Sequence, residues 1–266
     1  MSSFRTASPP AVDRALSIME VLAASNHGLR LRDVSAKLAI PRSSAHSVLL
    51  ALERRGYLQR NDSTGRYFFG PKILSLANVA LRGMALREVA YPALLNLMRG
   101  TGLTVNMAVL DRQEAVLIEQ IEPVQVSAPM VWLGTHLDLH CTALGKALAA
   151  FQPRQEWDRL VAYLARPRHN DNTISSSGRF RRELAATRER GYAVDNEEFD
   201  LGMRCLAAPV FGASGGTVAA ISLKGSSSEI HDGNVESLVK SLLGAASAIS
   251  QALGNSAESS QLPAAS

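Results

Sequence analysis

The sequence has little cysteine and few aromatic residues, and it lacks a long apolar run. Of its 266 residues, two are Cys, two are Trp and 5% are aromatic. Two cysteines cannot form the disulfide framework of a small secreted protein, which favours a reducing compartment. No apolar run reaches the roughly 20 residues that span a bilayer, and the N-terminus lacks the pattern of a signal peptide. We therefore expect a cytoplasmic protein that does not contact a membrane.

Net charge is also low, but the charges are unevenly distributed. The formal net charge is +4. The first 70 residues contain ten Lys or Arg against five Asp or Glu, whereas the remainder contains eighteen against nineteen. A basic excess confined to one part of a chain is typical of a segment that binds phosphate groups. The hydrophobic content of 46% is that of a globular protein.

The basic part contains the pattern of a helix-turn-helix. A helix is predicted over residues 12–24, where Val12, Leu16, Met19 and Ala23 share one apolar face. Two more helices are predicted over 31–39 and 42–55, separated at Pro41. Proline disfavours helical backbone in the preceding residue and fits the first turn of the following helix. In the last helix the buried face is predicted to consist of Ala45, Val48, Leu49 and Leu52.

At the start of that last helix, Ser43 and Ser47 point directly away from the buried face, with Ser44 and His46 on its flanks. This is where a recognition helix meets base edges and phosphates. Residues 57–69 then predict a hairpin, or wing. The arginines predicted to contact the DNA backbone are Arg42 and Arg55 from the helix and Arg60 and Arg66 from the wing. A helical module that binds protein is the alternative, but the helix spacing, proline break, wing and charge together favour DNA.

The rest of the chain predicts an α+β domain. Residues 71–100 read as a linker helix that packs against a partner, followed by a first domain helix, with breaks at Gly83 and Pro92; a continuous intradomain helix is the alternative. Strands are predicted over 104–110, 115–121, 124–132, 206–211 and 218–224. Helices are predicted over 143–150, 155–165, 179–190 and 234–253. This order favours an antiparallel sheet covered by helices.

Three stretches resemble the IclR (isocitrate lyase regulator) family of bacterial transcription regulators. They are the segment RSSAHSVLLALERRGYL from Arg42, the segment GTHLDLHCTALGKA from Gly134, and the segment from Arg190 to Phe211. The second resembles the family pattern G-x-x-L-P-x-H-x-T-A-x-G-K-A. The resemblance implies a winged helix-turn-helix, a linker helix and a GAF-like effector domain. It also implies dimers formed mainly through the DNA-binding halves, and often tetramers.

The resemblance further implies a small-molecule pocket in the second domain. Carried over by position, it assigns apolar walls to Val126, Pro129, Leu137 and Met203, backbone N–H donors to Ala143 and Leu144, and polar side chains to Asp195, Cys205, Ser222 and Lys224. The first turn of a helix has unpaired N–H groups and a positive dipole end, which suit a carboxylate. Most ligands of the family are small acids.

Two positions depart from the family pattern. Asp138 stands where proline is usual, and Lys224 stands where serine is frequent. We hypothesise that Lys224 faces the pocket and pairs with an anionic ligand, because such a pair is strong only where it is desolvated. The alternative is a lysine at a strand edge that reaches solvent.

Metal binding and catalysis are two other possible functions of the second domain. His136, Asp138 and His140 alternate as on one strand face, and with Cys141 and Cys205 they are candidate metal ligands. They lack CxxC or HExxH spacing, so we expect no metal and no cofactor. Gly145-Lys146 lacks the other residues of a phosphate-binding loop, and no spacing supports a nucleophilic cysteine. We therefore do not expect an enzyme.

The sequence thus predicts a ligand-responsive transcription regulator that binds a roughly palindromic, double-stranded operator as a homodimer or homotetramer. The effector is expected to be a small organic acid and the target a catabolic operon. The alternatives are a metal-dependent hydrolase with a DNA-binding appendage and a DNA-binding regulator without a ligand. The expected parts are a tail at 1–10, a DNA-binding domain at 11–70, a linker helix at 71–88, an effector domain at 89–254 and a tail at 255–266.

Overall fold

The protein was analysed as a computed structural model that describes residues 9–124, 131–163 and 166–255. Its contacts divide the chain into two compact units, Met1–Gly83 and Met84–Ser266. We call them the N-terminal unit and the C-terminal unit and describe each by itself. The predicted tails lie outside the described residues, apart from Pro9, Pro10 and Asn255, and Pro10 already belongs to the first helix.

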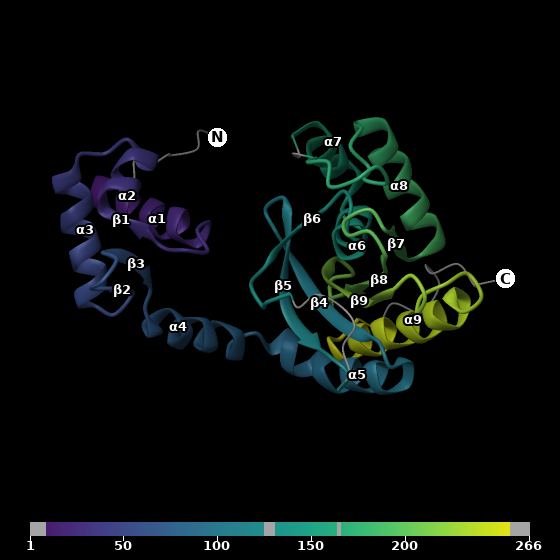
Figure 1. Cartoon of the computed structure of the whole chain (residues 1–266). Coiled ribbons are helices and arrows are strands. Elements are labelled where there is room, and N and C mark those ends of the chain that lie inside the picture. The colour runs from purple at the N-terminus through teal and green to yellow at the C-terminus, as the bar shows by residue number, and fades with distance from the viewer. Residues whose placement is uncertain (1–8, 125–130, 164–165, 256–266) are drawn as a thin grey trace. The chain divides into compact units, whose positions relative to one another are not determined.

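The N-terminal unit is the predicted helix-turn-helix with its wing (Figure 1). Its helices are α1 (Pro10–Ala23), α2 (Leu31–Leu38) and α3 (Arg42–Arg54). Its sheet has the order β1 (Leu29–Arg30), β3 (Arg66–Phe69), β2 (Leu58–Arg60). Helix α2 ends where Ala39 takes a left-handed conformation with φ 52°, and Pro41 caps the start of α3. Strand β1 was not predicted, because two residues are too few to show a period.

The prediction of which face of α1 is buried is wrong. Ile18 and Leu22 enter the core with Val34 of α2 and Leu49 of α3. Val12 and Leu16, in contrast, are 48% and 52% exposed. Helix α1 is apolar on two sides, and periodicity alone does not show which side meets the core.

A linker helix follows the wing. Helix α4 (Pro71–Arg82) has no buried residue, and α5 (Ala85–Thr101) begins after a break at Gly83 and Met84. The break at Gly83 was predicted, whereas the break at Pro92 is wrong because α5 runs through it. Proline removes one backbone hydrogen bond from a helix. Pro92 and Glu88, whose carbonyl loses its partner, are exposed, and the buried face of α5 holds the helix in place.

The C-terminal unit is an antiparallel six-stranded sheet between two layers of helices (Figure 1), which confirms the α+β class. Across the sheet the strands are β6 (His136–Asp138), β5 (Glu114–Ile121), β4 (Thr104–Asp111), β9 (Thr217–Ser226), β8 (Met203–Phe211) and β7 (Ala193–Asn196). Helices α5 and α9 (Val235–Ala252) pack on one face. The other face is covered by α6 (Ala143–Ala150), with α7 (Arg154–Tyr163) and α8 (Ser177–Arg190) outside it.

Two strand predictions need correction. Val124, Val131 and Trp132 are not in a strand, and the remainder of the predicted strand 124–132 lies outside the described residues. Strand β7 was not predicted, because its four residues mix buried and half-buried side chains with a polar end. It adds an edge to the sheet beside β8 and brings Asp195 onto the face that α6 covers.

Candidate functional site

The leading end of α3 exposes the predicted base-contacting side chains. Ser43, His46 and Ser47 are exposed and Ser44 is half-buried, while Ala45 between them is fully buried. The hydroxyl of Ser47 donates to the carbonyl of Ser43 at 3.0 Å, which still leaves its oxygen able to accept. This end of α3 therefore presents polar groups to solvent, as a recognition helix requires.

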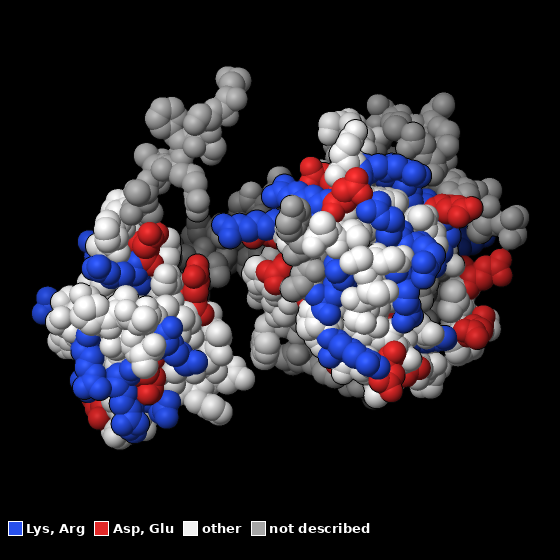
Figure 2. Space-filling view, turned by 90° about the horizontal axis from the view of Figure 1, so that it is seen from above, with Lys and Arg blue, Asp and Glu red and all other residues white. Residues whose placement is uncertain are grey.

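The two wing arginines differ in their surroundings. Arg60 is exposed and its guanidinium lies 5.9 Å from the centre of the Tyr67 ring. Arg66 is half-buried, and its Nη1 donates to the carbonyl of Gly28 at 2.8 Å. Arg60 is thus placed to meet a phosphate, whereas Arg66 also ties the wing to the turn after α1. Figure 2 shows several Lys and Arg side chains close together at one end of the smaller unit, with few acidic side chains among them.

The C-terminal unit contains a cavity between the sheet and the start of α6. It holds about 540 Å³ of space free of protein atoms, including its open mouth. Eight of the ten predicted effector residues line it, namely Leu137, Ala143, Leu144, Asp195, Met203, Cys205, Ser222 and Lys224. Val126 and Pro129, the other two, lie outside the described residues.

Strand register explains why the polar side chains meet. Asp195 of β7 pairs with Cys205 of β8, which pairs with Lys224 of β9, so the three form one row across the sheet. Paired residues on neighbouring strands point to the same face. Ser222 lies two residues before Lys224 and therefore on that face, opposite Asn106 of β4. Strand β9 is the fourth strand of six, so Lys224 is not at a sheet edge.

The start of α6 closes the cavity from the other side. The Thr142 side chain accepts from the backbone N–H of Gly145 at 3.1 Å and caps the helix. A Cβ at Gly145 would lie 2.5 Å from the carbonyl oxygen of Asp138, so only glycine allows this close approach. The helix has no acceptor of its own for the N–H groups of Ala143 and Leu144. Both residues line the cavity.

Burial controls the charge state of the cavity. Lys224 is 8% exposed and Asp195 is 4% exposed. Burial raises the pKa of Asp195 from 3.8 to about 7, against the opposing effect of a hydrogen bond from Glu198 and the charge of Lys146. Burial likewise raises the pKa of the Cys205 thiol, so it is protonated at neutral pH. A thiol in this state is a poor nucleophile.

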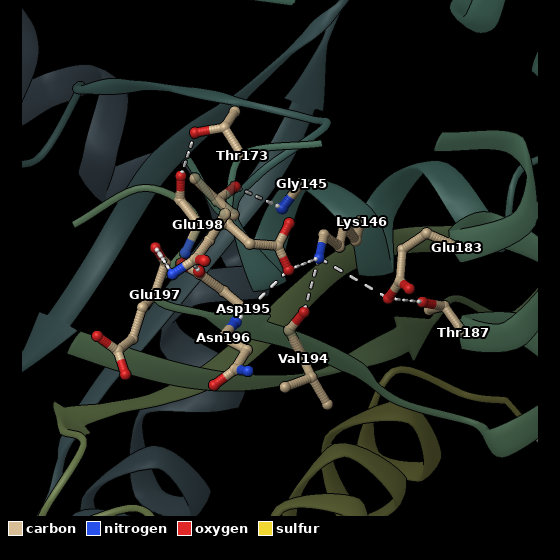
Figure 3. A network of polar contacts seen from close by, with 12 residues as sticks. Gly145, Lys146, Thr173, Glu183, Thr187, Val194, Asp195, Asn196, Glu197 and Glu198 are labelled. Atoms are coloured by element: carbon tan, nitrogen blue, oxygen red, sulfur yellow. Dashed lines mark hydrogen bonds and ion pairs between the residues drawn. The ribbon is translucent and has the colours of Figure 1, made fainter. Parts of the chain in front are cut away.

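Asp195 is connected to a buried ion network (Figure 3). Its Oδ1 accepts from the backbone N–H of Glu198 at 2.8 Å. The Glu198 carboxylate accepts from Lys146 Nζ at 2.5 Å, and the same Nζ donates to the Val194 carbonyl at 2.7 Å. Lys146 is fully buried, and Glu183 of α8 lies 3.7 Å from its Nζ. The network joins α6, β7 and α8 behind the cavity.

Several cavity residues were not predicted. Asn106, Leu117, Val131, Thr142, Phe199 and Asp200 complete the lining. The Oδ1 of Asn106 is buried and has no hydrogen-bond partner within the described residues. Its signal in the sequence was weak, because a single polar residue in an apolar strand pattern does not show which face it occupies.

The predicted histidine and cysteine candidates separate into three places. His136 pairs with Glu114 at 2.8 Å on the edge of the sheet. Cys205 lines the cavity, while His140 and Cys141 are buried before α6. The structure brings these last two to His169, which the sequence did not single out.

Comparisons with known proteins cover most of the chain. A model of the C-terminal domain of bacterial IclR transcriptional regulators matches residues 78–251, and a model of the IclR helix-turn-helix domain matches residues 11–62. The chain is 32% identical to the HTH-type transcriptional regulator XynR of Escherichia coli over 91% of its length and 96% of the relative. The chain belongs to the IclR family.

Other members of the IclR family are similar to this chain over nearly the same residues. The transcriptional repressor IclR of Escherichia coli is 31% identical over 91% of this chain and 89% of its own length. The crystal structure of Thermotoga maritima IclR matches with a TM-score of 0.71 and 32% identity, covering 91% of this chain and 98% of that one. An IclR homologue complexed with 4-hydroxybenzoate from Microbacterium hydrocarbonoxydans shares the fold at a TM-score of 0.76 and 23% identity, covering 91% and 98%.

This chain is therefore a DNA-binding transcription regulator of the IclR family. Within the described residues, no helix is both long and apolar enough to cross a membrane. The relatives XynR and IclR named above are both transcription regulators.

Proposed function

We propose that this regulator senses a small organic acid and that binding of the acid changes its affinity for an operator that controls a catabolic operon. The observation that carries the proposal is the row Asp195, Cys205 and Lys224 beneath the start of α6, in which Asp195 and Lys224 are buried and Cys205 is half-buried. A lysine charge in a site with little solvent attracts an anion far more strongly than a surface lysine does.

The cavity suits a carboxylate joined to a short apolar body. Lys224 and the first two residues of α6, Ala143 and Leu144, line it, and a helix N-terminus favours anions. Leu117, Leu137 and Met203 supply apolar wall. Asp195 in its protonated state donates a hydrogen bond to a carboxylate, whereas its ionised state repels one. We therefore expect acid binding to strengthen as the pH falls below 7.

We further propose that the regulator binds a roughly palindromic operator as a homo-oligomer. Ser43, Ser44, His46 and Ser47 contact bases or phosphates, while Arg42, Arg55, Arg60 and Arg66 contact the backbone. Helix α4 supports an assembly through the N-terminal unit, since it buries no residue within its own chain and exposes Leu74, Leu76 and Val79. Pairing of two recognition helices mirrors the symmetry of a palindrome. An acid shifts DNA affinity only if it binds one arrangement of the oligomer more tightly.

The test is thermal unfolding of the full chain with a panel of aliphatic and aromatic carboxylates. The panel includes 4-hydroxybenzoate, because that acid is bound by an IclR homologue of the same fold. A ligand that binds only the folded state stabilises it by about 2.7 kcal/mol at 100 times its Kd. We expect one acid to give a saturable rise in melting temperature and to change operator affinity at the same concentration.

Two lysine variants show whether the acid occupies the cavity. Lys224→Met keeps the side-chain length and removes the charge, and should abolish the rise. Lys240→Met removes an exposed lysine of α9 and should leave it unchanged. A panel without any response, or an equal rise in both variants, would count against an acid sensor and favour a neutral ligand or a regulator without one.

A further inference from the structure

We propose that His140, Cys141 and His169 form a binding site for a divalent metal ion of the zinc class beside the effector cavity. One potential ligand atom from each residue lies within 4.8 Å of the others. The ligands come from two segments that the fold brings together, the turn between β6 and α6 and the loop after α7. The sequence led us to expect no metal, because its histidines and cysteines lack CxxC or HExxH spacing, and it did not single out His169.

The His140 ring is set up as a metal ligand by its surroundings. The ring is fully buried, and its Nε2 lies 3.0 Å from the carbonyl oxygen of Pro167. A carbonyl only accepts, so Nε2 carries the proton and Nδ1 carries the lone pair. This Nδ1 is buried and has no hydrogen-bond partner within the described residues. A buried acceptor left without a partner destabilises the fold, and a metal ion at Nδ1 removes that cost.

His169 has the carboxylate partner that metal-binding histidines commonly have. Its Nε2 lies 2.8 Å from Oδ2 of Asp138. A proton shared along that contact leaves Nδ1 with the lone pair and fixes the orientation of the ring. Thr173 holds the loop, since its Oγ1 accepts from the backbone N–H of His169 at 3.2 Å and donates to the Glu198 carbonyl at 2.7 Å. Asp138 is one of the two departures from the family pattern.

Cys141 supplies the third ligand. It is a free cysteine with no exposed surface, and on binding the metal its thiol proton would pass to solvent as the sulfur–metal bond forms. Ligands that lie 2.0–2.3 Å from a tetrahedral zinc ion are about 3.3–3.7 Å apart. The group therefore needs to contract by at most about 1.5 Å. Two imidazole nitrogens and one thiolate suit zinc better than magnesium or calcium.

The proposed metal site adjoins the effector cavity, so a bound metal ion would affect a wall of that cavity. The His169 ring packs on Phe199 with 4.6 Å between ring centres, and Phe199 lines the effector cavity. Thr142, the residue after Cys141, lines it too. A metal ion at the site would fix the loop after α7 against the start of α6 and so fix one wall of the cavity. Three protein ligands leave a fourth position for water or another donor.

The test is metal uptake by the full chain, purified without metal-affinity steps and treated with a chelator. We expect one zinc ion per chain after dialysis against ZnCl2, a rise in melting temperature, and a thiolate-to-metal absorption band when Co²⁺ replaces zinc. Cys141→Ser and His169→Ala should each weaken zinc binding at least about 100-fold, and Asp138→Asn by about 10- to 100-fold.

Matched variants distinguish this site from adventitious binding. His136→Ala removes the nearby histidine that pairs with Glu114, and Cys205→Ser removes the other cysteine. Both should bind zinc as the natural protein does. Circular dichroism confirms that each variant is folded, and His169→Ala is the safest of them because its side chain is 30% exposed. Absence of a cobalt–thiolate band, or equal zinc affinity in His169→Ala and His136→Ala, would overturn the proposal.

Discussion

Asp195 makes the stability of the C-terminal unit depend on pH. Its pKa rises from 3.8 to about 7 through burial, so between these values the folded state binds more protons than the unfolded state. Stability from this group is full below pH 4 and falls as pH rises towards and through 7. The rise corresponds to about 4 kcal/mol. Asp195→Asn keeps an oxygen that accepts from the Glu198 N–H and removes the ionisation. We expect this variant to be the more stable protein at pH 8 and the difference to be much smaller at pH 4.5, measured by urea unfolding.

An exposed carboxylate supplies the control for this prediction. Asp111 ends β4 and is exposed, so Asp111→Asn should follow the pH dependence of the natural protein. If Asp195→Asn and the natural protein lose stability in parallel from pH 4.5 to 8, Asp195 is ionised in the folded state throughout that range. Its proposed role as a hydrogen-bond donor to the acid would then be wrong.

For single residues, the sequence predicted the cavity lining wherever the family resemblance supplied a position. Asp195, Cys205, Ser222 and Lys224 were named in advance, and they line one cavity. The buried polar contacts around the cavity were not predicted. The buried pair of Lys146 with Glu198 and the contact of His169 with Asp138 join residues far apart in the chain. Such contacts depend on tertiary packing, which no local pattern encodes.

Helix α3 and the wing between β2 and β3 should contribute in different ways to DNA binding. Arg60 is an exposed cation on the wing, so Arg60→Gln should weaken binding to all sequences alike and reduce the slope of log affinity against log salt by about 1. His46 is exposed near the start of α3, so His46→Ala should change the preference among operator variants instead. Fluorescence anisotropy with operator and scrambled DNA at several salt concentrations measures both effects.

An arginine outside the DNA-binding unit serves as the reference. Arg159 of α7 has a side chain that is 68% exposed, and Arg159→Gln should leave affinity and salt slope unchanged. A salt slope in Arg60→Gln equal to that of the natural protein would show that the wing does not reach a phosphate.

Elements were predictable where a regular apolar period continued for several turns or strand residues. Helices α2, α3, α6 and α9 lie within two residues of their predicted bounds. Strands β1, β6 and β7 were missed because they are short and gain their hydrogen bonds from neighbours. The break at Pro92 was overpredicted, since packing of Ala90, Leu94 and Leu97 outweighs the loss of one hydrogen bond.

At the scale of the whole molecule, the chain has apolar surface that its own fold leaves exposed. Leu74 and Val79 of α4 are 73% and 69% exposed, and Val12 and Leu16 of α1 are about half exposed. Burial of such side chains stabilises an assembly by about 25 cal/mol per Å². The sequence predicted that the linker helix packs against a partner, and in the proposed homo-oligomer that partner is a second copy of the chain, related by the symmetry of the proposed palindromic operator.

We therefore expect the double variant Leu74→Lys and Val79→Lys to dissociate into monomers in analytical ultracentrifugation, because each added charge would be buried without a partner. The recognition helix of each monomer would then bind a half-site independently. Because the two DNA-binding units would no longer be joined in one dimer, operator affinity should fall by about 100- to 10,000-fold. The melting temperature of the C-terminal unit should stay the same. Leu201→Lys changes an exposed leucine of the C-terminal unit, 69% exposed, and should alter neither property. A double variant that remains a dimer would place the interface away from α4.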